Sequence, residues 1–183
     1  MNKQPAVTAA TRQRIVDAFW NLFARKQISQ IRIREITMNA GLNRCTFYQY
    51  FDDIYEILHE EEDRIINEII RNKISADAQT DFKNILSEIA DMYQTNGKYI
   101  TILTGENGDP HFSKLLKDRL LPEFRRRRKL CDSVSTDIIF EYGINGLLAA
   151  CRTWYLNSAQ LSAEDFLVTA EKITMHGIPA AFS

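Results

Sequence analysis

The sequence predicts an all-α protein in which a small N-terminal head, residues 1–53, precedes a larger helical domain, residues 54–183. Two observations predict this class. Apolar residues recur at spacings of three and four along most of the chain, which places them on single helix faces. The 183 residues also include only seven Gly and four Pro, which indicates short connections between helices. We find no convincing strand in the sequence.

The expected helices follow one another with brief breaks. Each is assigned where a periodic apolar stripe lies next to a capping residue, a glycine or a proline. Residues 1–10 are small and polar, and we expect them to form a mobile arm. The expected helices cover residues 11–24, 33–40, 44–50, 54–73, 82–95, 110–130, 134–157 and 163–177.

Several of these helices have recognisable ends. Thr11 and Asn43 are suitable N-caps, because their side-chain oxygens can accept hydrogen bonds from the first turn. Asp109 followed by Pro110 is a typical helix start. Gly41 readily adopts the left-handed conformation that ends a helix. Pro122 is expected to bend its helix or to begin a further segment.

Charge is distributed unevenly along a chain whose net charge is −1. Residues 1–51 hold eight Lys or Arg against two acids, giving +6, and the remainder holds 15 against 22, giving −7. A basic head on an acidic body indicates that the head meets an anion. The three cysteines have no paired spacing, and no signal peptide or membrane span is visible, so we expect a cytoplasmic protein.

The stretch "NRCTFYQYFDD" concentrates the features that bear on function. At 100° per residue, Phe47 and Phe51 fall on an inward face, Tyr48 and Gln49 face outward, and Tyr50 lies at the border. Two short helices joined by a brief glycine turn predict a helix-turn-helix. A helix of this kind fits the major groove of DNA, where Arg can bind guanine and Gln can bind adenine.

The segment "RIVDAFWNLFARKQISQIRIREITMNAGLNRCTFYQYFDD" resembles the tetracycline-repressor (TetR/AcrR) family of bacterial transcription regulators. The resemblance rests on an amphipathic first helix, "IREI" in the second, "AGL" at the turn and "TFYQYF" in the third. Three positions depart from the family pattern. Arg32 replaces a Thr, Cys45 replaces a small residue, and Ile54 replaces a Lys that the family uses as a phosphate contact.

The resemblance implies a homodimeric, ligand-responsive DNA-binding regulator with no enzymatic activity, no cofactor and no metal site. We expect a repressor that a small molecule of unknown identity releases from a palindromic DNA operator. The candidate DNA-binding residues lie on the second and third helices: Arg32, Arg34, Thr37, Arg44, Cys45, Thr46, Tyr48, Gln49 and Tyr50.

Candidate residues of the larger domain fall into two sets. Effector contacts are expected among residues of the middle helices: Phe82, Met92, Tyr93, Tyr99 and Phe112. Dimerisation as a four-helix bundle is expected through residues of the last two helices: Phe140, Ile144, Leu147, Leu148, Cys151, Tyr155, Phe166, Ala170 and Ile173.

Other interpretations stay open at this point. A helical co-activator or adaptor would keep the fold, act through a protein partner and bind DNA weakly, and Ile54 favours it. Cys45 is either a redox-sensitive thiol or a passive surface residue. The run "RRRRK" at 125–129 is either a second nucleic-acid patch or a structural helix face. The three histidines show no metal-ligand spacing.

Overall fold

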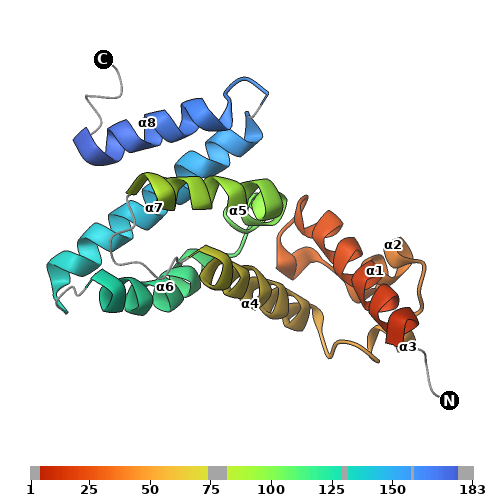
Figure 1. Ribbon diagram of the computed structural model, residues 1–183. Coiled ribbons are helices and arrows are strands. Elements are labelled where there is room, and N and C mark those ends of the chain that lie inside the picture. The colour runs from red at the N-terminus through yellow and green to blue at the C-terminus, as the bar shows by residue number, and fades with distance from the viewer. Residues whose placement is uncertain (1–4, 74–81, 129–131, 158, 177–183) are drawn as a thin grey trace. The chain divides into compact units, whose positions relative to one another are not determined.

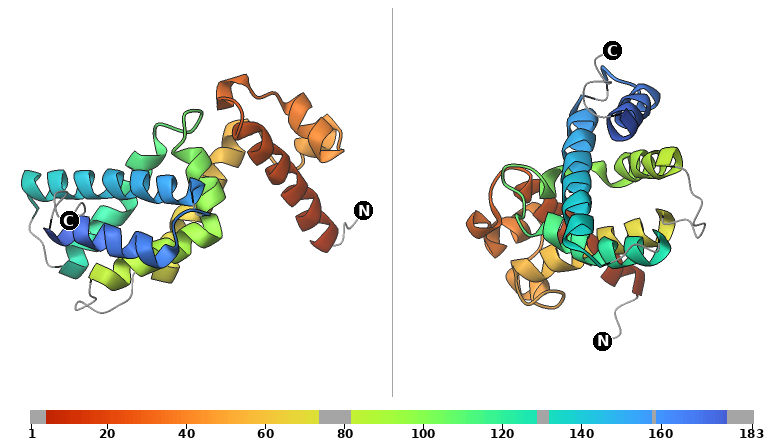
Figure 2. Two further views of the ribbon diagram at one scale, coloured as in Figure 1. Left: turned by 90° about the horizontal axis from the view of Figure 1, so that it is seen from above. Right: turned by 90° about the vertical axis from the view of Figure 1, so that its left-hand side faces the viewer.

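The computed structural model describes residues 5–73, 82–128, 132–157 and 159–176, and these residues form helices without a strand (Figures 1 and 2). The all-α prediction is confirmed. The α-helices are α1 (Pro5–Phe23), α2 (Ile33–Ala40), α3 (Arg44–Phe47), α4 (Ile54–Lys73), α5 (Phe82–Leu103), α6 (Phe112–Arg128), α7 (Val134–Leu156) and α8 (Ala163–His176), and a short 3-10 turn, η1, covers Ile28–Gln30.

The chain divides into two compact units. The first, called the head below, comprises Met1–Arg64 together with Gly105–Asp109, and the second, called the body, comprises Ile65–Thr104 and Pro110–Ser183. The division falls inside α4, whereas the sequence placed it before this helix. Packing accounts for the difference, because the first half of α4 holds buried side chains such as Ile57 and Leu58.

An aromatic cluster forms the core of the head. Phe19, Trp20 and Phe23 of α1 are each at most 1% exposed, and their ring centroids lie 5.3–6.0 Å apart. Ile36 of α2 and Phe47 of α3 are fully buried in the same unit. Full burial of one large apolar side chain contributes on the order of 1.5–3 kcal/mol. Within this unit, α2 packs against α1 and α3 packs against α2.

Two adjacent glutamates of α4 are buried in the head in different ways. Glu61 accepts a hydrogen bond from Trp20 Nε1 at 3.1 Å and one from Arg64 Nη2 at 3.1 Å. Glu62 is 2% exposed and lies against Asp109. Burial, reinforced by the negative charge of Asp109, raises the pKa of Glu62 to about 8. Glu62 is therefore mainly neutral at pH 7.

Two helix ends in the head differ from the sequence-based expectation. Helix α1 begins at Pro5 rather than at Thr11, which agrees with the preference of proline for the first helical position. Helix α3 ends at Phe47 rather than at Tyr50, because Gln49 N bonds Thr46 O and Tyr50 N bonds Phe47 O in tighter, three-residue turns.

In the body, α5 packs against α7 and α8, and α7 also contacts α6 and α8 (Figures 1 and 2). The Tyr93 hydroxyl of α5 donates to Leu148 O of α7 at 3.3 Å. Trp154 of α7 stacks on Phe166 of α8 with ring centroids 4.9 Å apart, and its Nε1 donates to Leu161 O at 3.1 Å. These contacts join the three helices into one core.

The end of α5 and the start of α6 differ from the expected positions. Helix α5 continues to Leu103 instead of ending at residue 95, and Gly97 lies inside it. A Cβ at Gly97 would lie 2.5 Å from two carbons of the Tyr155 ring, so glycine permits this close packing. Helix α6 begins at Phe112, beyond the expected Asp109–Pro110 start, and includes Pro122 without ending there.

Candidate nucleic-acid interface

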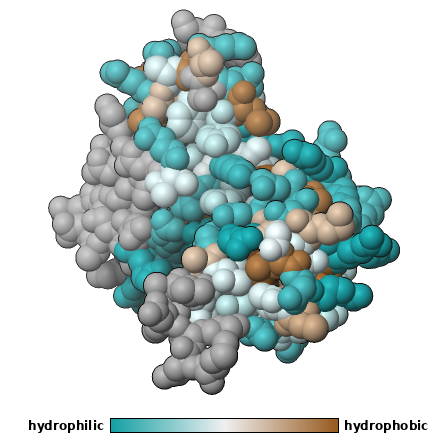
Figure 3. Space-filling view, turned by 90° about the vertical axis from the view of Figure 1, so that its right-hand side faces the viewer, coloured by the Kyte–Doolittle hydropathy of each residue, from teal (hydrophilic) through white to brown (hydrophobic). Residues whose placement is uncertain are grey.

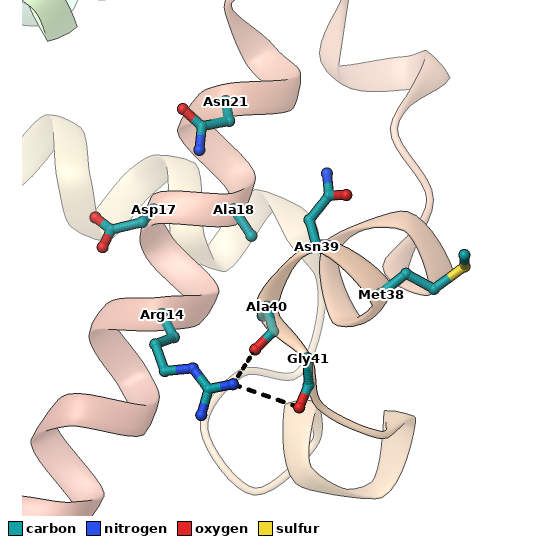
Figure 4. A pocket seen from close by; sticks show the side chains of 8 residues that line it. All are labelled: Arg14, Asp17, Ala18, Asn21, Met38, Asn39, Ala40 and Gly41. Atoms are coloured by element: carbon teal, nitrogen blue, oxygen red, sulfur yellow. Dashed lines mark hydrogen bonds between the residues drawn. The ribbon is translucent and has the colours of Figure 1, made fainter.

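The turn between α2 and α3 is held in a single conformation. Gly41 has φ 63°, ψ 40°, the left-handed conformation expected from the sequence. Leu42 N donates to Thr37 O at 2.8 Å, and Gly41 N donates to Met38 O at 3.1 Å. The Arg14 guanidinium of α1 donates to the carbonyl oxygens of Ala40 and Gly41 (Figure 4). These bonds satisfy the carbonyls at the end of α2 and fix the direction in which α3 leaves the turn.

The next turn is held from its own first residue. Asn43 Oδ1 accepts hydrogen bonds from the Thr46 backbone N–H at 2.8 Å and from the Thr46 hydroxyl at 3.1 Å. The predicted N-cap is thus confirmed. Thr46 is half-buried and its hydroxyl is used inside this cap, so its first role is to shape α3.

The aromatic residues that follow divide between the core and the surface. Phe47 and Phe51 are 0% and 2% exposed, and their ring centroids lie 6.0 Å apart. Tyr48 is 51% exposed and meets Phe47 edge-on. Gln49 is exposed and Tyr50 is half-buried. The division predicted from the helical wheel is confirmed, although the backbone tightens after Phe47.

Helix α2 presents a different set of side chains from the one expected. Arg32 and Arg34 are exposed, as predicted. Thr37 is only 3% exposed, and its hydroxyl donates to Arg34 O at 3.0 Å. Residues 33, 36, 37 and 40 form an i, i+3, i+4, i+7 stripe, a pattern in the sequence that already assigned Thr37 to the core face. Met38, which is 68% exposed, occupies the surface of α2 instead.

Ion pairing in the head leaves a cationic surface. Lys26 Nζ lies 2.6 Å from Glu35 Oε1, and its hydrogen bond holds the pKa of Glu35 below the usual value. Arg12 pairs with Glu60, and its guanidinium lies 4.9 Å above the centre of the Phe51 ring. The exposed basic residues in the described part of the head are Arg14, Arg25, Arg32, Arg34, Arg44 and Arg64, of which Arg64 pairs with Glu61.

The exposed side chains of α2, α3 and the following turn form one candidate contact surface. We call it the reading surface and define it by Arg34, Met38, Arg44, Cys45, Tyr48 and Gln49. It combines cationic, amide and phenol groups, the side chains that bind phosphates and base edges in DNA. The part of the surface coloured in Figure 3 is mainly hydrophilic, with small separate hydrophobic patches.

The candidate effector residues occupy unequal positions in the body. Tyr93 and Phe112 are fully buried, and burial raises the pKa of the Tyr93 hydroxyl. Tyr99 is half-buried, with Lys98 Nζ lying 5.8 Å from its ring centre. The side chains of Phe82 and Met92 lie outside the described residues. Contact of these residues with an effector stays a prediction.

Four of the nine candidate dimerisation residues are buried within the chain, and contact of this set with a second copy stays a prediction. Leu148, Cys151, Phe166 and Ala170 are buried, and burial raises the pKa of the Cys151 thiol to about 12. The half-buried residues are Phe140, Ile144, Leu147 and Tyr155, and Ile173 is 38% exposed. The exposed apolar residues of α7 are a different set: Val134, Ile138, Ile139, Tyr142 and Leu156.

The remaining motifs have ordinary structural surroundings. Arg125, the first residue of the basic run, pairs with Asp132 at 2.6 Å and Asp137 at 2.7 Å, which agrees with a structural role for this residue. Among the described residues, no three His, Cys, Asp or Glu side chains gather as a metal site. None of the described helices combines the length and apolar character needed to cross a membrane.

The head is therefore a helix-turn-helix unit, and the chain as a whole is an all-α, two-unit protein. Its sequence matches no protein-family model and no curated protein. Its structure, however, is similar to a TetR transcriptional regulator from Streptococcus agalactiae (TM-score 0.63, 20% identity, covering 93% of this chain and 95% of that one).

Two further solved structures are similar over nearly their whole length. The fatty acid degradation regulator FadR from Bacillus halodurans has a TM-score of 0.64 and 16% identity, with 97% of this chain and 98% of that chain covered. The dihydroxyacetone kinase operon activator DhaS has a TM-score of 0.55 and 20% identity, with 92% and 96% covered. The chain has the fold of TetR-family regulators.

Proposed function

We propose that this protein is a homodimeric, ligand-responsive transcription regulator that binds a palindromic DNA operator. The observation that carries the proposal is the reading surface, on which Arg44, Tyr48 and Gln49 are exposed next to a rigid glycine turn. A short recognition helix makes few base contacts, and a two-fold dimer doubles them by placing two such helices in successive major grooves. The similar structures named as regulators support the same function.

We assign different roles to the side chains of the reading surface. Arg44 can donate two hydrogen bonds to guanine, and Gln49 can bond both adenine N6 and N7. The Tyr48 hydroxyl can donate to a phosphate and so fix the register of the helix on the duplex. Cys45 lies on the same exposed face, where it would add a small side chain near the base edges.

We further propose that an effector in the body lowers the affinity of the dimer for its operator, which makes the protein a repressor. Helix α4 supports this coupling, because residues of one continuous helix belong to both the head and the body. Coupling energies between such sites are typically about 1–3 kcal/mol. DhaS is named an activator, so the opposite direction of regulation occurs on the same fold.

The central test is binding of the purified protein to the promoter region of its own gene, measured by gel shift at several salt concentrations. We expect a sequence-selective complex whose affinity falls steeply with salt, as release of counterions from phosphates requires. Tyr48→Phe should weaken binding to most sequences, whereas Gln49→Ala should relax the preference at one base pair. Absence of any selective, salt-dependent complex would exclude the proposed function.

A matched arginine pair provides the control for this test. Arg44 on α3 and Arg71 on α4 are both exposed, but only Arg44 belongs to the reading surface. Arg44→Ala should weaken operator binding by about 1–3 kcal/mol, the usual value of a bidentate guanine contact. Arg71→Ala should leave binding unchanged, and equal losses in the two variants would show that net charge, not the reading surface, determines affinity.

A second candidate function is a co-activator or adaptor that acts through a protein partner. Ile54, at the position where the family places a phosphate-binding Lys, favours it, and so does the exposed apolar face of α7. This function predicts weak, non-selective DNA binding together with a stable complex with another protein. Comparing the DNA fragments and the proteins that co-purify with the chain distinguishes the two functions.

A further inference from the structure

A short segment between α5 and α6 belongs to the head. Gly105–Asp109, called the 105–109 segment below, is part of the head unit, whereas Thr104 before it and Pro110 after it belong to the body. Within the segment, Gly108 N donates to Gly105 O at 3.1 Å, which closes a turn. The chain therefore passes from one unit to the other at both ends of this segment as well as inside α4.

Glu62 of α4 is the buried group that meets this segment. It is 2% exposed and shares a hydrogen bond with Asp109, the last residue of the segment. Two carboxyl groups can form such a bond only when one of them carries a proton, because a carboxylate has no donor. Since burial and the charge of Asp109 raise the pKa of Glu62 to about 8, the proton resides on Glu62, which donates to Asp109.

The adjacent glutamate is held in a different way. Glu61 Oε2 accepts hydrogen bonds from Trp20 Nε1 of α1 at 3.1 Å and from Arg64 Nε and Nη2 at 3.2 and 3.1 Å. Donors of this kind stabilise a carboxylate. They bind Glu61 rather than its neighbour, and among the described residues Glu62 Oε1 finds no hydrogen-bond partner.

The charged side chains that act on Glu62 come from the segment and from α4. Asp109 and Asp63 both raise the pKa of Glu62, and Glu106, the other acid of the segment, is exposed. From α1, the uncharged Trp20 indole reaches this part of α4. An ionised Glu62 is therefore buried near like charges, which desolvation and repulsion both disfavour. Ionisation favours an arrangement in which Glu62 reaches water.

We propose that Glu62 and Asp109 form a pH-sensitive latch, in which one shared proton holds the 105–109 segment on α4 and loss of this proton releases the segment. The O–H bond of Glu62 breaks, the proton passes to solvent, and both carboxylates become hydrated. Release relieves the burial of Glu62 and weakens its repulsion by Asp109. The latch goes beyond the proposed function, because it requires neither DNA nor an effector.

The direction and steepness of the response follow from proton linkage. Glu62 keeps its proton up to about pH 8 when the segment is closed, and only up to about pH 4.5 when the side chain is exposed. Opening therefore releases a proton between these values, and the equilibrium constant for opening should rise up to about tenfold per pH unit. Above about pH 8 the carboxyl is ionised in both states, so the constant levels off.

The first test is a pH titration of the glutamate carboxyl carbons of the full chain by NMR. We expect one signal with a midpoint near pH 8 that is absent from Glu62→Gln. Asp109→Asn should lower this midpoint, because it removes a nearby negative charge, and Glu106→Gln should leave it unchanged. If no glutamate signal titrates between about pH 7 and about pH 9, the proposal is overturned.

Hydrogen exchange of the full chain, followed by mass spectrometry, measures release of the segment itself. The reporter is the Gly108 amide, which is bonded within the segment, and the rates are corrected for the intrinsic pH dependence of exchange. Exchange in the wild type should accelerate up to about tenfold per pH unit and level off above about pH 8. Glu62→Gln should stay slow throughout, because its amide cannot ionise and can donate to Asp109. Glu106→Gln should follow the wild type.

Asp109→Asn provides a second variant should Glu62→Gln fail to fold. It changes a half-buried loop residue, and its exchange should level off at a lower pH than that of the wild type. Corrected exchange that is independent of pH in the wild type, or that rises equally in Glu62→Gln, overturns the latch. Operator binding has no part in these measurements, so a failure of the latch leaves the proposed function to its own test with the Arg44 and Arg71 variants.

Discussion

The head and helix α7 differ in how reliably an apolar side chain is buried. In the head, Phe47 and Phe51 are buried, while their neighbours Tyr48 and Gln49 are exposed. In α7, apolar residues occupy both faces, so that Leu148 is 7% exposed and Ile139 is 72% exposed. In a short amphipathic helix such as α3, the polarity of the side chains is therefore enough to predict which face is buried. In a long apolar helix such as α7, predicting the buried face also requires knowing which residues pair with its few charged side chains.

The largest expected change in stability distinguishes the buried Phe47 from the exposed Tyr48. Phe47→Ala should lower the free energy of unfolding by about 3–5 kcal/mol, because it leaves a cavity in the aromatic core. Tyr48→Ala removes an equally aromatic but half-exposed side chain and should cost less than about 1 kcal/mol while reducing DNA binding. Urea unfolding together with gel shift measures both quantities, and similar stability losses would contradict the division of faces.

The next prediction concerns Glu62, one of two buried glutamates of α4. Its pKa is about 8 in the folded chain and near 4.5 when exposed, so the protonated form favours folding. This contribution to the free energy of unfolding is complete below about pH 4.5 and is lost as the pH rises through about 8. Its upper bound is about 1.4 kcal/mol for each unit by which the folded-state pKa exceeds the unfolded one.

Unfolding by urea at about pH 5 and about pH 9 measures this dependence. Glu62→Gln should abolish most of the difference, because the amide cannot ionise. Glu106→Gln provides the control, since Glu106 lies in the Gly105–Asp109 segment but is exposed. An unchanged pH dependence in Glu62→Gln would show that another group is responsible.

Two helical glycines of the body test the difference between inner and outer faces. Gly97→Ala places a methyl group 2.5 Å from the Tyr155 ring and should cost about 1–3 kcal/mol through overpacking. Gly143→Ala meets no atom within 4 Å and should raise stability by up to about 1 kcal/mol. Thermal unfolding at a fixed protein concentration distinguishes them, and changes of the same sign would contradict the assigned faces.

A smaller loss than that of Gly97→Ala is expected at the turn of the head. Gly41→Ala should cost about 1–2 kcal/mol, because the left-handed conformation brings Cβ too close to the following carbonyl oxygen. Gly41→Asn should cost less, since Asn adopts this conformation more readily. Chemical denaturation can rank the two variants, and equal losses would indicate that contact with Arg14, not backbone strain, limits this position.

Local signals were sufficient to predict much of the fold. The bounds of α2 and α4 agree with the periodic stripes, and Gly41 and Asn43 mark the end of α2 and the start of α3, because caps and stripes are determined by nearby residues. The predicted end of α5 was wrong, because the helix continues through Gly97, and the Tyr155 ring that packs against this glycine is distant in the sequence.

The candidate site shows the same limit. Tyr48 and Gln49 were assigned correctly from the helical wheel, whereas Thr37 was placed on the surface on the strength of family resemblance although its own spacing indicated the core. The outer face of α7 could not be identified, because the ion pairs of Asp137 and Glu141 join residues of different helices. These pairings become visible only when the helices are packed.

The division of α4 between the two units has a consequence for exchanging parts between such proteins. Arg64 is the last residue of α4 in the head and Ile65 the first in the body, with no break in the helix between them. Inserting a single residue at this junction would rotate everything beyond it by about 100° and shift it by about 1.5 Å. A chimera that joins this head to another body must therefore preserve the number of residues across the junction, or change it by whole turns, to keep the helical phase.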